Sequence, residues 1–232
     1  MIYNESIRTI KRIGTVLSIL CAIIYIAKLR NFLVKRLPYF DLVIIQIPMF
    51  IVEVVLNIAV ISLIVSLSLR IKNPILLIIS VIELTLITLR YLAVFYMIYV
   101  FEAVSRFVLS LIFLPIRMLS VLCLVDYITF VIVLLSFIVY SALELLLYRI
   151  FDNQYFLISS LVLVSLSTCL ALIEFFRRVL LVHIVSTINQ LEACLHKLDD
   201  LFAGLYYGLN VLHFAILTLA FVNLKSRSIS LC

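Results

Sequence analysis

Charged residues, glycine and proline are all scarce in this sequence. Only 13% of its 232 residues are charged, and it contains just 3 Gly and 4 Pro. Hydrophobic residues instead make up 66% of the chain, and the mean hydropathy is +1.34. A soluble domain of this length has no core large enough to bury so much apolar surface, so lipid must surround most of it. The composition therefore excludes a soluble protein and indicates a membrane protein.

Sequence patterns for metal binding and catalysis are also lacking. The cysteines include no C-x-x-C pair and the histidines have no metal-like spacing, so we predict neither a disulfide framework nor a metal centre, and we expect His213 to be packed inside its span. No Gly-rich phosphate loop, H-E-x-x-H sequence or Ser/His/Asp pattern occurs. The Lys and Arg lie between apolar segments rather than in one basic patch, which argues against nucleic-acid binding. We therefore expect no enzyme and no cofactor.

Long apolar stretches recur along the chain and define its fold class. Leu, Ile, Val and Phe dominate them, without the alternation of lipid-facing and lumen-facing residues that a barrel requires. The sequence predicts an all-α, multi-pass transmembrane helical bundle of five to seven spans that forms a single domain over residues 1–232. Five stretches have the roughly 20 residues that span a bilayer, namely residues 42–66, 75–100, 127–148, 155–175 and 202–222.

Two further apolar segments leave the number of spans open. Residues 13–27 are shorter than the hydrocarbon core requires, and residues 107–125 contain both Pro115 and Arg117. With seven spans Lys and Arg divide evenly between the two sides, whereas with five spans they divide twelve against five in favour of the N-terminal side. Because cytoplasmic loops are enriched in Lys and Arg, this bias favours five spans with a cytoplasmic N-terminus. The two weak segments then lie on the membrane surface or re-enter it.

A heptad rhythm runs from residue 184 to residue 205. Apolar residues recur at alternating spacings of four and three, namely Ile184, Ile188, Leu191, Leu195, Leu198, Phe202 and Leu205. Polar residues lie between them, so we expect the opposite face of the helix to contact water. The rhythm predicts that residues 176–201 form a helical cytoplasmic extension with at most a short break before the last span. Its apolar face either packs on its own bundle or contacts another subunit of a homo- or hetero-oligomer.

Ionisable residues inside apolar spans are costly in lipid and are the first candidates for function. They are Glu53, Glu83 and Arg90 within spans and Glu102, Glu144 and Glu174 near span ends. Glu83 and Arg90 share a helix face but lie about 10 Å apart along the axis, too far to pair. We expect Arg90 to pair with Glu53 of another helix, either as an ion pair that fixes packing or as part of a ligand pocket or ion path.

Aromatic residues follow Arg90 on the same predicted helix. Tyr91, Phe95 and Tyr96 would add rings and hydroxyl groups to a pocket for a small organic ligand. Aromatic stripes in membrane helices also serve as packing or interface anchors. The ligand-binding candidates of the sequence are Glu53, Glu83, Arg90, Tyr91, Phe95 and Tyr96.

The C-terminal third contains a run of related patterns. Residues 171–183 read Ala-Leu-Ile-Glu-Phe-Phe-Arg-Arg-Val-Leu-Leu-Val-His, followed by Ile-Asn-Gln-Leu-Glu-Ala-Cys-Leu, Leu-His-Lys-Leu-Asp-Asp-Leu-Phe and Tyr-Tyr-Gly-Leu-Asn-Val-Leu. Residues 171–222 resemble insect gustatory receptors. In that family a fourth span ends in a basic helical extension with an Asn-x-x-Leu-like element, and a Leu-rich helix leads into a fifth span that opens on an aromatic-Gly pair.

The resemblance implies a chemosensory receptor of the plasma membrane, one subunit of a ligand-gated cation channel that detects small organic tastants. It places subunit contacts in residues 184–205. The family's last two spans have no counterpart before Cys232, which implies a truncated or divergent member. Two other classes fit the sequence. One is a non-conducting membrane scaffold or accessory subunit, and the other is a small transporter, for which neither internal repeats nor Gly- and Pro-broken helices are present.

Overall fold

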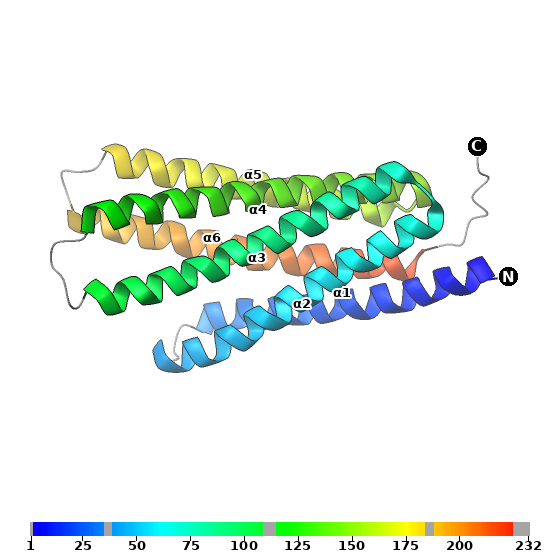
Figure 1. The fold of residues 1–232 in the computed structure, drawn as a ribbon, viewed down its shortest axis with the longest axis horizontal. Coiled ribbons are helices and arrows are strands. Elements are labelled where there is room, and N and C mark those ends of the chain that lie inside the picture. Colours follow the sequence, from blue (N-terminus) through cyan, green and yellow to red (C-terminus); the bar gives the residue numbers. More distant parts are fainter. Residues whose placement is uncertain (1, 35–38, 109–114, 184–187, 225–232) are drawn as a thin grey trace.

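Long helices make up nearly all of the described part of the chain. The computed structural model describes residues 2–34, 39–108, 115–183 and 188–224. Within these residues the chain forms helices and no strand (Figure 1), which confirms the predicted all-α fold. The helices are α1 (Ile2–Val34), α2 (Tyr39–Ile71), α3 (Pro74–Val108), α4 (Pro115–Phe151), α5 (Gln154–His183) and α6 (Ile188–Val222).

Each helix is long enough to cross a bilayer. The shortest, α5, has 30 residues, which at about 1.5 Å per residue gives about 45 Å, more than the roughly 30 Å of a hydrocarbon core. Six segments are long and apolar enough to span, namely Ile7–Leu33, Pro48–Ile71, Pro74–Ala93, Tyr127–Phe151, Gln154–Phe176 and Asp200–Val222. Large apolar side chains such as Leu92 and Leu161 are more than half exposed on the outside of these segments. The chain is therefore an integral, multi-pass membrane protein.

The described residues contain six such helices, whereas the two span counts weighed from the sequence were five and seven. Residues 13–27 are not a short surface segment, because their polar flanks extend them into the 33 residues of α1. Residues 107–125 are divided between the end of α3 and the start of α4, and residues 109–114 lie outside the described residues. Proline suits the first helical position because its missing N–H has no partner there. Pro115 therefore begins α4 instead of interrupting a separate span.

Six spans remove the charge bias that favoured a cytoplasmic N-terminus. We assign each Lys and Arg to the nearer end of its apolar segment and leave out Arg90 inside α3. Eight of these residues then lie on the N-terminal side and nine on the opposite side. The N-terminus and the end of α6 lie at the same end of the bundle (Figure 1). Because the positive-inside rule needs a surplus on one side, the count no longer selects an orientation, and the cytoplasmic N-terminus stays a prediction.

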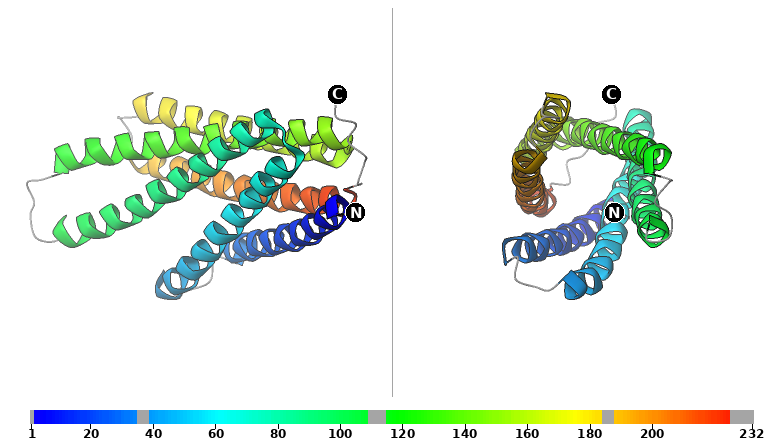
Figure 2. Two further views of the ribbon diagram at one scale, coloured as in Figure 1. Left: turned by 45° about the vertical axis from the view of Figure 1, so that its right-hand side comes forward. Right: turned by 90° about the vertical axis from the view of Figure 1, so that its left-hand side faces the viewer.

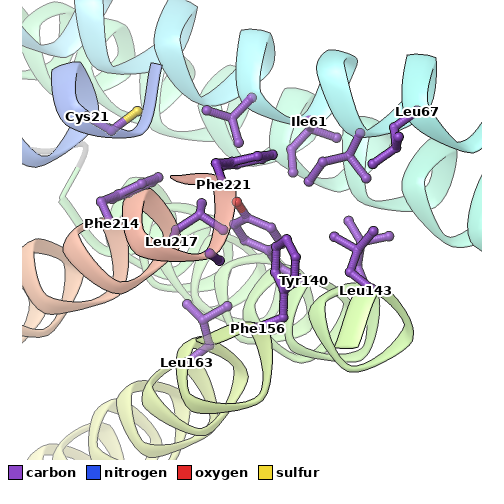
Figure 3. Packing of buried hydrophobic residues seen from close by; sticks show 14 of the residues in the cluster. Cys21, Ile61, Leu67, Tyr140, Leu143, Phe156, Leu163, Phe214, Leu217 and Phe221 are labelled. Atoms are coloured by element: carbon purple, nitrogen blue, oxygen red, sulfur yellow. The ribbon is translucent and has the colours of Figure 1, made fainter. Parts of the chain in front are cut away.

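The helices pack in a closed ring in chain order. Each helix packs against the next one along the chain, and α6 packs against α1, as the end-on view in Figure 2 shows. Buried apolar side chains such as Leu143, Phe156, Leu217 and Phe221 fill the centre (Figure 3). Helix association in lipid depends on such close packing, because lipid tails are as apolar as the side chains themselves. The ring brings α1 and α6 together although they lie at opposite ends of the sequence.

Two short turns of the same construction join α2 to α3 and α4 to α5. Lys72 and Asp152 follow the helix ends in a left-handed conformation, with φ of 57° and 50°. Asn73 and Asn153 come next, and each accepts a backbone hydrogen bond from the first turn of the following helix. The Asn153 amide also donates to the carbonyl oxygen of Ala220 at 2.8 Å. The α4–α5 turn is therefore fixed to the end of α6.

The heptad segment is divided between two helices. α5 ends at His183 and α6 begins at Ile188, while Ile184 lies outside the described residues. The predicted extension over residues 176–201 therefore falls partly on each helix. The side chains of Ile188, Leu191, Leu195 and Leu198 also lie outside the described residues. Phe202 and Leu205 are half-buried, and Phe202 packs against the core of its own bundle. Of the two alternatives for the heptad face, Phe202 therefore shows packing on its own bundle and not contact with another subunit.

Candidate functional site

Four helices bring charged and hydroxyl-bearing side chains together inside the bundle. These residues, which we call the Glu53 cluster, are Tyr25 and Lys28 of α1, Glu53 and Asn57 of α2, Arg90 and Tyr91 of α3, and Tyr206 of α6. Glu53 and Arg90 are only 4% and 7% exposed. Charges this deep in a membrane protein are expensive and mark either a functional position or an ion pair that fixes packing.

Glu53 is the centre of this cluster. Its Oε1 accepts hydrogen bonds from the hydroxyls of Tyr25 at 2.7 Å and Tyr91 at 3.3 Å. Its Oε2 pairs with the Lys28 ammonium group, and Arg90 Nη2 lies 3.7 Å from Oε1. The pairing of Glu53 with Arg90 that the sequence predicts is confirmed. Two cations and two hydroxyls together compensate the carboxylate for the water it has lost.

Arg90 connects α3 to α6. Its Nη2 donates to the Tyr206 hydroxyl at 2.9 Å. The guanidinium also lies over the rings of Tyr91 and Phe137, 5.0 and 5.5 Å from their centroids. Arginine stacks on aromatic rings and tolerates burial better than lysine because its guanidinium is planar and weakly hydrated. The aromatic surroundings therefore stabilise a cation that lipid alone would exclude.

The cluster has a defined depth and an excess of positive charge. Glu53, Arg90 and Tyr206 all lie roughly 25 Å along their helices from the end of the bundle that carries the short turns. This depth is close to the far boundary of a hydrocarbon core of roughly 30 Å. Lys28 and Arg90 contribute two positive charges, whereas Glu53 contributes one negative charge. The cluster is therefore electrostatically suited to an additional negative or hydrogen-bond-accepting group.

The structure brings together three of the ligand-binding candidates and separates the others. Glu53, Arg90 and Tyr91 belong to the Glu53 cluster. Phe95 and Tyr96 are 65% and 53% exposed, so they face the outside of the bundle and not a pocket shared with Arg90. Each helical residue turns the side-chain direction by about 100°, and five or six residues beyond Arg90 this rotation points away from the core. Glu83 lies in a different place, described below.

Sequence reasoning missed the contributions of α1 and α6. Lys28 looked like a loop charge at the end of a short apolar segment, and its pairing with Glu53 appears only because α1 continues through it. Tyr25 and Lys28 are three residues apart and so share a helix face, which was the available signal. For Tyr206 no signal existed, since its neighbour Tyr207 has the same chemistry.

A second set of polar residues lies nearer the short turns. This set, which we call the Glu83–Glu144 cluster, consists of Glu83, Ser136, Tyr140, Glu144, Ser159 and His213 from α3 to α6. Ser136 donates to Glu83 at 2.8 Å, and Ser159 donates to Glu144 at 3.1 Å. Glu83 and Glu144 are both fully buried. The Glu83–Glu144 cluster therefore holds two carboxyl groups within one apolar core.

The other ionisable residues singled out in the sequence are His213, Glu174 and Glu102. His213 is buried and packs edge-on against the rings of Tyr140 and Phe214, at centroid distances of 5.3 and 4.8 Å, which confirms that this histidine is packed inside its span. Glu174 is buried near the end of its span. The side chain of Glu102 lies outside the described residues. Among the side chains that the structure describes, buried charge is concentrated in the two clusters and at Glu174.

Comparison of the chain with models of protein families, with curated proteins and with solved structures gives no significant match. The likeness to gustatory receptors therefore rests on residues 171–222 alone. The observations that indicate a function therefore lie in the two clusters and the membrane-spanning fold.

Proposed function

We propose that this chain is a chemosensory membrane receptor that binds a small organic ligand at the Glu53 cluster and, by its resemblance to gustatory receptors, serves as a subunit of a ligand-gated cation channel in the plasma membrane. The observation that carries the proposal is the burial of Arg90 and Glu53, with the half-buried Lys28, against tyrosine hydroxyls between four helices. Because α1, α2, α3 and α6 all meet there, a ligand at this place contacts four helices of the ring at once.

The chemistry of the Glu53 cluster indicates the class of ligand. Its excess positive charge favours an acidic group, and Arg90 offers a planar donor fork that matches a carboxylate. The rings of Tyr91, Phe137 and Tyr206 around Arg90 suit an aromatic or apolar body. A small aromatic carboxylic acid combines both features, and benzoate is the simplest probe of this kind.

Binding of benzoate to the detergent-purified chain tests the proposal. A ligand that binds only the folded state at 100 times its Kd adds about 2.7 kcal/mol of stability, so we expect the Tm of the wild type to rise with benzoate concentration. Arg90→Lys keeps the charge but loses the planar fork, and we expect it to lose most of the rise. Thr88→Val on the same helix alters only an exposed hydroxyl that bonds to Leu84, so it should respond like the wild type.

A benzoate response that survives in Arg90→Lys, or no response from the wild type to any small carboxylic acid, contradicts ligand binding at this place. The second candidate, a non-conducting scaffold or accessory subunit, then becomes the better account. It is favoured by the bonding of Glu53 to Lys28 and Arg90 within the bundle itself, since such a network can serve packing alone. In that case the variants change the stability of the protein and no binding property.

We also propose that the first part of α6 forms the contact between subunits. In a background without native cysteines, Leu191→Cys on the apolar heptad face should give a covalent dimer on mild oxidation of membranes. Ala193→Cys is turned by about 200° around the helix and should remain monomeric. Only monomer from Leu191→Cys, or equal dimer from both variants, contradicts this contact.

A further inference from the structure

Among the described residues, the buried side-chain atoms that have no hydrogen-bond partner all belong to the Glu83–Glu144 cluster. They are Glu83 Oε2, Tyr140 OH, Glu144 Oε2 and His213 Nε2. The four side chains are at most 5% exposed. Buried polar groups are nearly always paired in folded proteins, and inside a bilayer bulk water does not compensate them. Four unpartnered atoms in one cluster therefore require a physical explanation.

The atoms on α4 and α6 converge on one place. Ser159 Oγ lies 3.1 Å from Glu144 Oε1 and 2.9 Å from His213 Nδ1. His213 Nε2 in turn lies 3.8 Å from Glu144 Oε1. The Tyr140 ring stands edge-on to the His213 ring, and Figure 3 shows that its hydroxyl points into the core, toward Phe221. Both the hydroxyl and the imidazole are thus directed into the bundle and away from lipid.

Glu83 of α3 is connected to the same place through α4. Ser136 donates to Glu83 Oε1 at 2.8 Å. Ser136, Tyr140 and Glu144 follow one another at intervals of four residues, so they share one face of α4. The charge of Glu83 acts on Glu144, and the charges of both act on the Tyr140 hydroxyl. Glu83 therefore lies in the same electrostatic surroundings as Tyr140 and Glu144.

A count of protons shows that the cluster is short of hydrogen-bond donors. Ser159 has one hydroxyl proton and donates it to Glu144. Its bond with His213 therefore needs the proton of Nδ1, and a neutral imidazole with a proton on Nδ1 presents Nε2 as an acceptor. When both carboxyl groups are ionised, three of the four unpartnered atoms are acceptors, and the Tyr140 hydroxyl alone brings a proton.

The cluster is also short of positive charge. Arg90 of α3 acts on Glu83, but its guanidinium is engaged by Glu53 and Tyr206 in the other cluster. Cys21 of α1 also acts on the Tyr140 hydroxyl, and a thiol brings no positive charge. An ionised carboxyl group at membrane depth needs a counter-charge. The donor shortage and the charge shortage point to the same kind of occupant.

We infer that the Glu83–Glu144 cluster binds a monovalent cation that donates hydrogen bonds, either an ammonium group or a proton carried by water as hydronium. Such a cation supplies N–H or O–H donors together with the positive charge. Sodium and potassium ions supply the charge but no donor. Within the described ranges, no three His, Cys, Asp or Glu side chains meet in the arrangement of metal ligands. This binding place shares no residue with the Glu53 cluster and does not depend on the ligand proposed there.

Thermal unfolding of the full chain in detergent, with ammonium chloride as the probe, tests the inference. At saturating concentration and constant pH, the wild type should unfold roughly 5 °C higher in ammonium chloride than in equimolar sodium chloride. Glu83→Gln and Glu144→Gln should each lose this difference, because they remove the charge and keep an oxygen for the serine bond. Ser141→Ala removes a buried hydroxyl of α4 that bonds to Ser160 outside the cluster, and it should keep the difference.

The two cations give different results. If hydronium is the cation, the wild type gains stability as the pH falls, because a site that takes up a proton on folding stabilises the protein at lower pH. Ammonium then adds nothing, and both glutamine variants lose the gain. Equal stabilisation by sodium or potassium overturns the inference. So does a response that both glutamine variants retain, or the absence of any response to ammonium and to pH.

Infrared spectroscopy of the wild type gives a second readout that needs no variant. Ammonium replaces the protons of the buried carboxyl groups, so the absorption of the protonated carboxyl should weaken when ammonium chloride replaces sodium chloride. Hydronium keeps its proton on water, so lowering the pH should weaken the absorption of the protonated carboxyl and add the broad absorption of a hydrated proton. An absorption that changes under neither condition contradicts binding of either cation.

Discussion

Glu53→Gln is expected to lose roughly 3 to 5 kcal/mol of stability, the cost of removing one partner from a buried ion pair. The substitution keeps an oxygen that can accept from Tyr25 but removes the negative charge between Lys28 and Arg90. Two cations then face each other in the interior without a counter-ion. The Tm of the detergent-purified chain, followed by size-exclusion chromatography after heating, should fall by roughly 10 °C.

A compensating variant separates this charge effect from lost packing. Glu53→Gln combined with Arg90→Met removes one charge of each sign and fills the space of the guanidinium with an apolar chain. We expect the double variant to recover much of the loss, because replacing a buried pair with apolar groups is often neutral. A double variant with the sum of the two single losses would show that Glu53 and Arg90 do not act on one another.

Gly14→Leu is expected to destabilise the contact between α1 and α6 by more than the roughly 1 to 3 kcal/mol typical of overpacking. A Cβ at position 14 would already lie 2.5 Å from Phe221 Cδ1. Phe221 has no room to move, since it is fully buried and its ring stands edge-on to Phe156 at 6.0 Å between centroids. α1 must therefore shift away from α6, and the measured Tm should fall sharply.

Gly208 of α6 is the matched control. Nothing lies within 4 Å of a Cβ at this position, and alanine is a better helix former than glycine by about 1 kcal/mol. Gly208→Ala should therefore leave the Tm unchanged or raise it. In a Gly14→Ala background, Phe221→Leu should restore part of the lost stability by giving the new methyl group room. Equal effects of Gly14→Ala and Gly208→Ala would contradict the close approach of the two helices.

The apolar composition shows that lipid surrounds this protein, and lipid restricts which folds are possible. With 66% hydrophobic residues and 13% charged ones, the long segments can only be lipid-facing helices, because lipid leaves no other way to satisfy the backbone. The same scarcity of charge made the pairing of Glu53 with Arg90 predictable. Each ionised residue in an apolar span needs a partner, and few were available.

The number of spans could not be read from hydropathy alone. It depends on where helices begin and end, which the end residues and the packing decide together. In the sequence Pro115 interrupts an apolar segment, whereas in the structure it is the first residue of α4. The apolar part of α1 is short, and its length as a span comes from polar flanks that hydropathy discounts.

Composition and periodicity act locally along each helix, so the amino-acid sequence was enough to identify a helical membrane protein with costly charges inside it. Which of these charges meet depends on how the helices pack. The closure of the ring places α6 against α1, and this contact brings Lys28 and Tyr206 to Glu53 and Arg90. It also leaves His213 facing Glu144. Such meetings depend on how each helix is rotated and how deep it sits, which are set by packing between segments far apart in the chain.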